Sequence, residues 1–178
     1  IKMREQQESQ RVLSAVYKIA ESVSVSTGVA FFEKLMLNMT ESVGAQVGII
    51  TRLPSIDAAN SRSVVAVVDG VIVDNFDIPM SGTPCENLTS KTPEWIVPSN
   101  AIAKYPRSEG LVEFGAEAYV GRRIEDSLGR PMGQVFVLFR QHLVQTDFVS
   151  SVLKIFTARI AAEFERQEKE QHIHEQAS

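Results

Sequence analysis

The dipeptide Asp69-Gly70 stands between two runs of β-branched and apolar residues, SVVAVV before it and VIV after it. A two-residue turn between strands needs positive φ at both central positions, which Asp-Gly accepts more readily than most pairs. The pattern therefore predicts a tight β-hairpin, and a tight hairpin joins antiparallel strands. We expect the chain to build an antiparallel sheet around it.

Other strand-like runs lie on both sides of this hairpin. QVGIITRL precedes it, a short EWIVP follows it, and AYVGRRIE and GQVFVLFR form a later pair around the turn DSLGRP. Three segments instead repeat apolar residues every three or four positions, which is typical of amphipathic helices. The predicted order is helix, helix, three strands, an irregular crossover, two strands and a long helix.

The three predicted helices differ in how much of each can be buried. The first, REQQESQRVLSAVYKIAESVSV, is polar before Val12; the second ends at Gly44, where a C-terminal cap is expected. The last begins at Thr146 and turns polar after Phe164. Both terminal helices should therefore extend beyond the hydrophobic core. The apolar face of the second helix is predicted to comprise Phe31, Phe32, Leu35, Met39 and Val43, and that of the last Val149, Val152, Leu153, Phe156, Ile160 and Phe164.

The middle of the chain, from about Asp77 to Gly115, is irregular. It holds five of the seven prolines, and single helical turns are expected in NAIAKYP and EGLVEFG. Long irregular segments in compact domains are usually functional or disordered. This one carries Trp95, Tyr105 and Phe114, so we expect it to be ordered and to cover the sheet face opposite the helices. A cavity between them is the natural ligand site.

Composition excludes several classes of protein. The 178 residues carry a net charge of −4, which argues against a nucleic-acid-binding module. No apolar run has the ~20 residues that a membrane span needs. A single cysteine cannot form an internal disulfide, which fits a reducing, cytoplasmic location. The chain begins with Ile1, so we expect it to be a piece of a longer protein.

Few residues are candidates for chemistry. Cys85 lacks an evident base, and we expect a buried thiol in the crossover, with redox sensing as the alternative. The histidines His142, His172 and His174 do not have the spacing of a metal site. Arg122 and Arg123 are adjacent in a predicted strand, so one should face the cavity. That guanidinium either holds an anionic ligand or pairs with Glu117 or Glu125.

The order of motifs resembles the GAF domain, a sensory module related to PAS domains. The resemblance rests on GTPCENL, WIVPSNAIAKYP, LVEFGAEAYVGRRIEDSLGRPMGQVFVLFR and VLKIFTARIAAEFER, and spans most of the chain. It implies an α+β fold with a six-stranded antiparallel sheet, helices on one face and the crossover on the other. It also implies a small-molecule pocket and homodimerisation through the terminal helices.

The resemblance also implies a division of the chain. Residues 1–24 would be an N-terminal signalling helix, residues 25–166 the GAF domain, and residues 167–178 the start of a linker toward an output domain. That output domain would be a histidine kinase or diguanylate cyclase of a bacterial signalling protein. The Asn-Lys-Phe-Asp-Glu signature of cyclic-nucleotide-binding GAF domains is absent, and Cys85 is followed by Glu86 rather than by the His common at bilin attachment sites.

These patterns predict a non-catalytic sensor domain that binds an unidentified small effector, with no cofactor assigned. A ligand-free dimerisation module is the alternative. An enzyme like the GAF-fold methionine sulfoxide reductases is a third, disfavoured by the single cysteine. The candidate ligand-binding residues are Phe76, Cys85, Trp95, Tyr105, Phe114, Tyr119 and Arg122.

Overall fold

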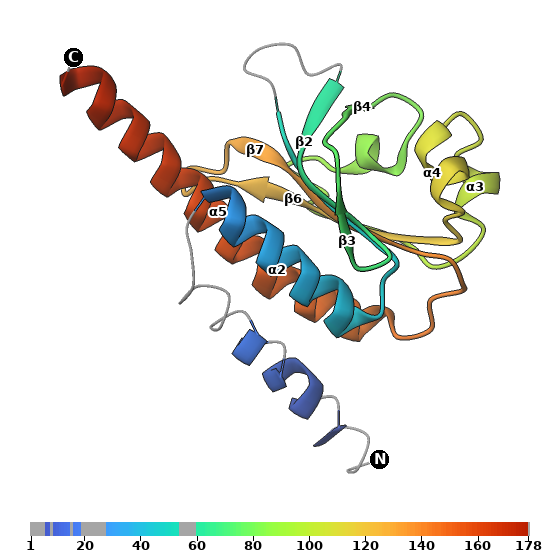
Figure 1. The fold of residues 1–178 in the computed structure, drawn as a ribbon. Helices are drawn as coiled ribbons and strands as arrows, with labels where there is room; N and C mark the ends of the chain where they lie inside the picture. The colour runs from blue at the N-terminus through green and yellow to red at the C-terminus, as the bar shows by residue number, and fades with distance from the viewer. Residues whose placement is uncertain (1–5, 8, 15, 19–27, 54–59, 178) are drawn as a thin grey trace.

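The structure, a computed structural model, describes residues 6, 7, 9–14, 16–18, 28–53 and 60–177 (Figure 1). Its centre is one antiparallel sheet in the order β3-β2-β1-β7-β6-β5, with the short β4 paired to β2. Six strands were predicted and are confirmed; β4 is an addition. The strands are β1 (Val47–Arg52), β2 (Asn60–Val68), β3 (Val71–Val73), β4 (Asp77–Pro79), β5 (Glu94–Val97), β6 (Ala118–Glu125) and β7 (Pro131–Phe139).

The predicted hairpin joins β2 to β3. Val68 pairs with Val71, and the two turn residues have positive φ, 50° at Asp69 and 77° at Gly70. Arg140, just after β7, donates hydrogen bonds to both carboxylate oxygens of Asp69, at 2.5 and 3.1 Å. The turn is therefore fastened to the centre of the sheet as well as to its own strands.

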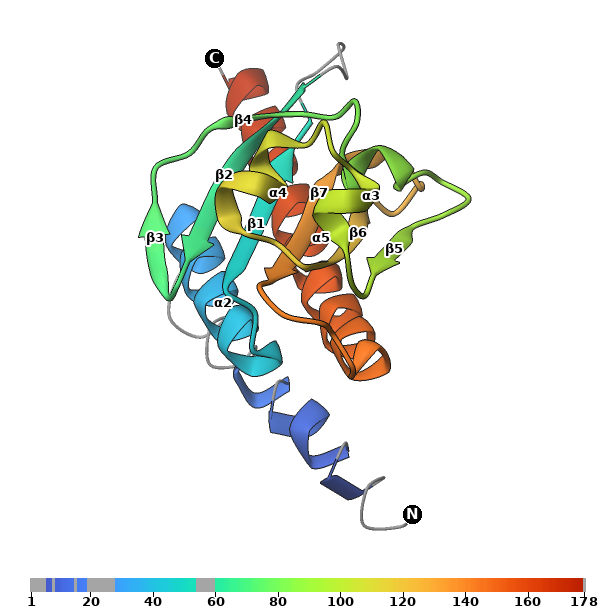
Figure 2. The ribbon, with the colours of Figure 1, turned by 90° about the vertical axis from the view of Figure 1, so that its right-hand side faces the viewer.

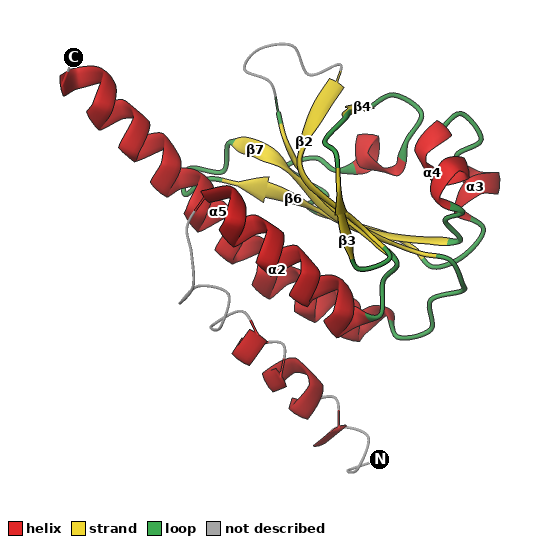
Figure 3. Cartoon of the chain, viewed as in Figure 1, coloured by secondary structure: helices red, strands yellow, loops and turns green. Residues whose placement is uncertain are grey.

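Two helices cover one face of the sheet and lie against each other (Figures 1 and 3). They are α2 (Gly28–Val43) and α5 (Thr146–Ala177). The predicted apolar faces of both helices are buried, Phe32, Phe156, Ile160 and Phe164 among them. Gly48 in β1 lets α2 approach closely, because a Cβ there would lie 2.4 Å from Cγ2 of Thr40.

Beyond Phe164, α5 leaves the sheet. The side chains from Glu168 to Gln176 are exposed, and Figure 1 shows this end projecting past the strands. Two contacts hold the point of departure. Ser127 N–H, in the β6–β7 turn, donates to Glu165 at 2.6 Å, and Arg52, at the end of β1, donates to Gln167 at 3.2 Å.

The crossover segment covers the opposite face (Figure 2). It contains β4, a single 3₁₀ turn η1 (Pro84–Asn87), β5, α3 (Ala101–Lys104) and α4 (Glu109–Phe114). The helical turns expected in NAIAKYP and EGLVEFG are thereby confirmed. The strands accordingly separate two apolar clusters, one under α2 and α5 and the other under the crossover.

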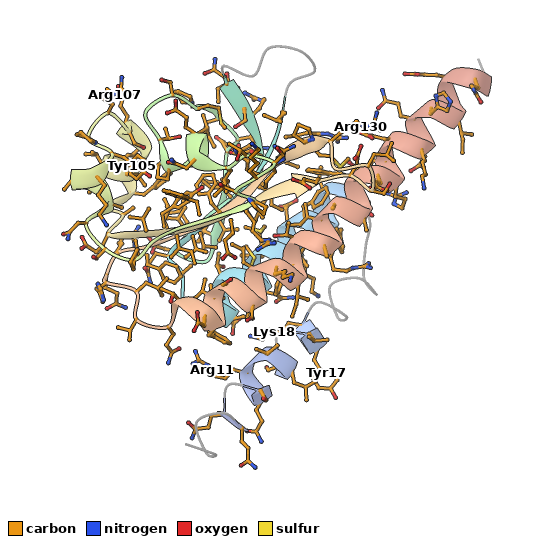
Figure 4. All side chains as sticks on the ribbon, turned by 180° about the vertical axis from the view of Figure 1, so that it is seen from behind. Arg11, Tyr17, Lys18, Tyr105, Arg107 and Arg130 are labelled. Atoms are coloured by element: carbon orange, nitrogen blue, oxygen red, sulfur yellow. The ribbon has the colours of Figure 1, made fainter. Side chains whose placement is uncertain are left out.

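Part of the first predicted helix lies within the described residues, and these are helical at 6, 7, 9–14 and 16–18. Arg11 donates to Gln145 at 2.6 Å, and its guanidinium lies 4.0 Å from the centre of the Phe148 ring. Lys18 pairs with Glu41 of α2 at 3.7 Å. Figure 4 shows Arg11, Tyr17 and Lys18 on this segment. Its predicted apolar positions Ile19, Ala20 and Val23 lie outside the described residues.

We expect the contact between the start of α2 and α5 to weaken in acid. Glu163 accepts hydrogen bonds from Arg166 and from Gly28 N–H, and these, Arg166 foremost, hold its pKa below the ordinary 4.5. The ionised form is therefore the stabilising one. Its contribution is complete above about pH 4.5 and disappears as the pH falls through the lower pKa of the folded state. Urea midpoints of the parent and Glu163→Gln should differ at pH 7 and converge toward pH 3; a constant difference would contradict this.

Candidate functional site

A cavity of about 400 Å³ lies between the sheet and the crossover segment. Its floor is made by side chains of three central strands, all buried: Ile49 of β1, Tyr119 of β6, and Phe136 and Leu138 of β7. Alternate residues of a strand point to the same face, which places these four together. The stacked rings of Tyr119 and Phe136, with centroids 5.5 Å apart, form the aromatic part of the floor.

The roof of the cavity comes from the crossover. Phe76 and Phe114 meet with ring centroids 6.2 Å apart, and Ile78 and Leu111 complete its apolar surface. Arg140 fixes α4 in place, because its Nε donates to the carbonyl of Phe114 at 3.0 Å while its other nitrogens hold Asp69. One arginine thus connects the roof, the β2–β3 turn and the end of β7.

Cys85 sits in η1 at the inner wall of the cavity, 2% exposed. Its sulfur lies 3.4 Å from the hydroxyl of Tyr119, and its carbonyl accepts a hydrogen bond from Nε2 of Gln134 at 3.0 Å. Burial, only partly offset by the hydrogen bonds from Tyr119 and Thr83, raises the pKa of the thiol to about 11. A buried, protonated thiol is a poor nucleophile.

We therefore expect Cys85 to react slowly with thiol reagents in the native protein. A pKa of about 11 instead of 9.0 lowers the thiolate fraction about 100-fold, before any effect of access. Absorbance with a chromogenic disulfide reagent at pH 7.5 should rise slowly in buffer and by one thiol equivalent quickly in urea. Cys85→Ser is the blank, and fast labelling without urea would contradict the prediction.

Tyr119 lies flat along its own strand. A Cβ on Gly121, two residues further on the same face, would stand 2.1 Å from the Tyr119 hydroxyl and 2.6 Å from its Cζ. Only glycine leaves room for the ring in this position. Within the AYVG run, Tyr119 thus forms part of the floor of the cavity, and Gly121 leaves the space that the Tyr119 ring occupies.

Four of the seven candidate residues line this cavity: Phe76, Cys85, Phe114 and Tyr119. Trp95 and Tyr105 do not; the Trp95 indole donates to the Tyr105 hydroxyl at 2.8 Å, which donates to Asn87 at 2.8 Å. This chain of hydrogen bonds braces β5 against η1. Figure 4 shows Tyr105 on the crossover side of the sheet.

Arg122 also stays outside the cavity. Its Nη1 pairs with Glu94 at 2.9 Å, and the same carboxylate oxygen accepts a hydrogen bond from Ser150 of α5 at 2.6 Å. The pair therefore joins β5, β6 and α5 on the helix face. Arg123 pairs with Glu125, one of the expected partners, at 3.0 Å.

Several lining residues were not predicted. Ile49, Phe136 and Leu138 could have been found from strand alternation once the cavity face of β1 and β7 was known. Arg107 and Ser108 lie in the loop before α4 and also line the cavity. Their residue types and spacing give no sequence signal, because only the path of the crossover brings them over the sheet.

Metal chemistry finds no support in the described ranges, where no three His, Cys, Asp or Glu side chains gather in a way that could hold an ion. His172 lies on the exposed end of α5, with Nε2 3.1 Å from Nε2 of Gln176. Within those same ranges, none of the helices combines the length and the hydropathy that crossing a bilayer requires.

Comparison with solved structures bears directly on the fold. The GAF domain of nlh2 from A. aeolicus, in an inactive state, superimposes with a TM-score of 0.70, covering 90% of this chain and 99% of that one. The chain has the GAF fold. The GAF domain of the Acinetobacter phosphoenolpyruvate-protein phosphotransferase gives the same TM-score, 0.70, over 90% of this chain and 97% of its own.

The GAF fold is shared here with little sequence in common. Identity is 8% with the A. aeolicus domain and 12% with the Acinetobacter domain. The chromophore-binding domain of Stigmatella aurantiaca phytochrome P1 matches at 12% identity and a TM-score of 0.64, over 88% of this chain and 59% of that one. No protein-family model matches the sequence, and a search of curated proteins finds no match. The likeness accordingly concerns the fold alone.

Proposed function

We propose that this chain is a non-catalytic sensor domain, which binds a small effector in the cavity and passes the change to an attached output domain through its terminal helices. One observation carries the proposal: the same strands form the floor of the cavity on one face and the surface on which α5 packs on the other. Tyr119 faces the cavity, whereas its neighbours Ala118 and Val120 belong to the core under the helices.

The size and walls of the cavity support ligand binding. Small-molecule sites are mostly apolar clefts of about 300–1,000 Å³ with a few polar groups, and this cavity measures about 400 Å³ with a mainly apolar lining. The buried, protonated state of Cys85 supports a non-catalytic role. Two of the structural neighbours are named as the GAF domain of nlh2 and the GAF domain from a phosphoenolpyruvate-protein phosphotransferase, which supports a role as one module among several.

The terminal helices support transmission. The end of α5 is exposed and continues beyond the sheet, while Arg52 and the β6–β7 turn hold the position at which it departs. On the N-terminal segment, Leu13 and Tyr17 are 51% and 67% exposed, which favours pairing with a second copy. The division into residues 1–24, 25–166 and 167–178, the homodimer and the cytoplasmic location belong to this proposal, as does a histidine kinase or diguanylate cyclase output.

Native mass spectrometry of the purified chain tests the binding step. Mass in excess of the denatured chain that vanishes on denaturation is the expected result and would narrow the class of effector. Excess mass that survives denaturation would indicate covalent attachment at Cys85, against the proposal. A dimer without excess mass, in protein that also binds none of the small-molecule probes offered to it, would favour the ligand-free dimerisation module.

The transmission step has its own test in Arg52, whose charge links β1 to α5. Arg52→Met keeps the apolar stem and removes the bonds to Gln167 and Glu168. Hydrogen exchange at residues 165–177 is measured in protein that carries the co-purified compound and in protein freed of it. The difference in exchange rate between these two states should be smaller in this variant than in the parent. Lys154→Met, on an exposed face of α5, is the control. An unaltered ligand effect in Arg52→Met would contradict this route.

A further inference from the structure

Charged side chains line only the outer part of the cavity. Arg107, Glu109 and Glu113 are exposed, whereas the lining residues from β1, β6 and β7 are buried and, Tyr119 apart, wholly apolar. Asp77 also lines the cavity, but it already pairs with Arg62 at 3.0 Å. The cavity therefore has an apolar interior and a rim that carries charges of both signs.

Arg107, in the loop between α3 and α4, lies against Gly82, in the segment between β4 and η1. Its side chain lies across Gly82, whose added Cβ would come within 3.2 Å of Arg107 Cβ and 3.3 Å of Nε. Figure 4 places Arg107 at the outer edge of the crossover, on the same side of the sheet as Tyr105. Within the described part of the chain its guanidinium forms no ion pair or hydrogen bond. It is available to hold a carboxylate with two parallel hydrogen bonds.

Glu109 and Glu113 lie one turn apart on α4, so their carboxylates share a face. Neither forms an ion pair with any other described residue, Arg107 included. Like charges at this spacing repel each other slightly in the free protein. A cationic group at the rim would relieve that repulsion, whereas an anion alone would increase it.

Ser108 lies between these charges in sequence and points to the same cavity. It is 5% exposed, and its N–H donates to the Tyr105 carbonyl at 3.0 Å. Its hydroxyl caps no helix and forms no hydrogen bond within the described residues, although it lines the cavity. Since the hydroxyl faces the cavity and has no partner among the described residues, it can donate to or accept from a ligand there.

From these observations we infer that the effector is a zwitterionic amphiphile of the amino-acid type, with a carboxylate and an ammonium group at one end and an apolar side chain. The carboxylate binds Arg107 and Ser108, and the ammonium group binds Glu109 and Glu113. The apolar side chain enters the interior between Phe76, Phe114 and Phe136. The inference rests on the proposed function, since it assigns a chemical class to the ligand of that cavity.

Three probes with the same phenyl group and different charges test the class. L-phenylalanine carries both charges, 3-phenylpropionate only the carboxylate, and 2-phenylethylamine only the ammonium group. Isothermal titration with the full chain should show L-phenylalanine binding at least about tenfold more tightly than either single-charge probe, since a hydrogen-bonded charge is lost in each. Equal or tighter binding of a single-charge probe, or no binding of L-phenylalanine and L-leucine, would overturn the inference.

Variants of the exposed charged residues at the rim measure the contributions of the ligand's carboxylate and ammonium groups separately, without disturbing the core. Arg107→Gln should weaken the binding of L-phenylalanine about tenfold or more and leave the binding of 2-phenylethylamine unchanged. The double variant Glu109→Gln and Glu113→Gln should weaken the binding of the probes that carry an ammonium group and strengthen the binding of 3-phenylpropionate. Ser108→Ala should weaken the probes that carry a carboxylate. Lys104→Gln, an exposed cation of α3 outside the cavity, is the matched control. Equal effects of Arg107→Gln on all three probes would contradict the assignment.

Failure of this inference differs from failure of the proposed function. Excess native mass from a compound of another class, together with no binding of these probes, would overturn the zwitterion and leave the sensor intact. A cavity that takes up neither the probes nor any co-purified compound would overturn both.

Discussion

Phe164→Ala is expected to lower the free energy of unfolding by about 3–5 kcal/mol, as truncation of a fully buried phenylalanine usually does. Phe164 is 0% exposed and meets the Phe32 ring of α2 edge to face, with centroids 5.2 Å apart. The guanidinium of Arg52 lies 4.7 Å from the centre of its ring. One side chain therefore joins α5 to α2 and to the end of β1, at the point where α5 leaves the sheet.

Urea denaturation monitored by circular dichroism measures this loss as a shift of the midpoint. If Phe164→Ala does not fold, Phe164→Leu supplies the measurement, with an expected loss of about 1 kcal/mol because most of the apolar volume is kept. Ile173→Ala, on the same helix but 67% exposed, is the control and should leave the midpoint unchanged. A loss below about 1 kcal/mol for Phe164→Ala would show that α5 is not anchored here.

Gly121→Ala is the second large effect, and it should alter the cavity as well as stability. The new methyl group would stand 2.1 Å from the Tyr119 hydroxyl, so the ring must leave its place over the strand. Overpacking of this kind costs about 1–3 kcal/mol. The displaced ring also gives up its contact with the Cys85 sulfur, which exposes the inner wall of the cavity.

Two measurements distinguish these consequences. The urea midpoint reports the loss of stability, and the labelling rate of Cys85 in buffer reports the opening of the wall. Gly110→Ala is a matched control, because a Cβ at Gly110 has no atom within 4 Å, and alanine in a helix is more stable than glycine by about 0.5–1 kcal/mol. Ile160→Val, in the other core, controls for destabilisation alone. Cys85 labelling no faster than in Ile160→Val would contradict the displacement of Tyr119.

Much of the fold could be predicted because its signals are local. The Asp69-Gly70 turn, the Gly44 helix end and the apolar stripes of α2 and α5 each depend on residues that are neighbours in sequence. The short β4 was missed because three residues, one of them Pro79, give too little alternation to read. Strand order across the sheet is not a local property, and for this the resemblance to the GAF domain supplied the expectation.

The site could be predicted only in part. The aromatic content of the crossover pointed to Phe76, Phe114 and Tyr119, but it pointed equally to Trp95 and Tyr105, whose polar ends bind each other. Whether Arg122 or Arg123 turns toward the cavity depends on the phase of β6, and both find carboxylate partners instead. Arg107 lies far from the strands in sequence, so only the folded path of the crossover reveals its position.

The separation of the two apolar clusters has a consequence for how such a domain diversifies. Ile49 belongs to the cluster under the crossover and Ile50 to the one under the helices, although they are adjacent in β1. Substitutions at the first kind of position change the lining of the cavity, whereas the second kind of position keeps α2 and α5 packed on the sheet. The two faces of one strand can therefore vary almost independently of each other, and the same GAF architecture is compatible with sequences that share only 8–12% identity.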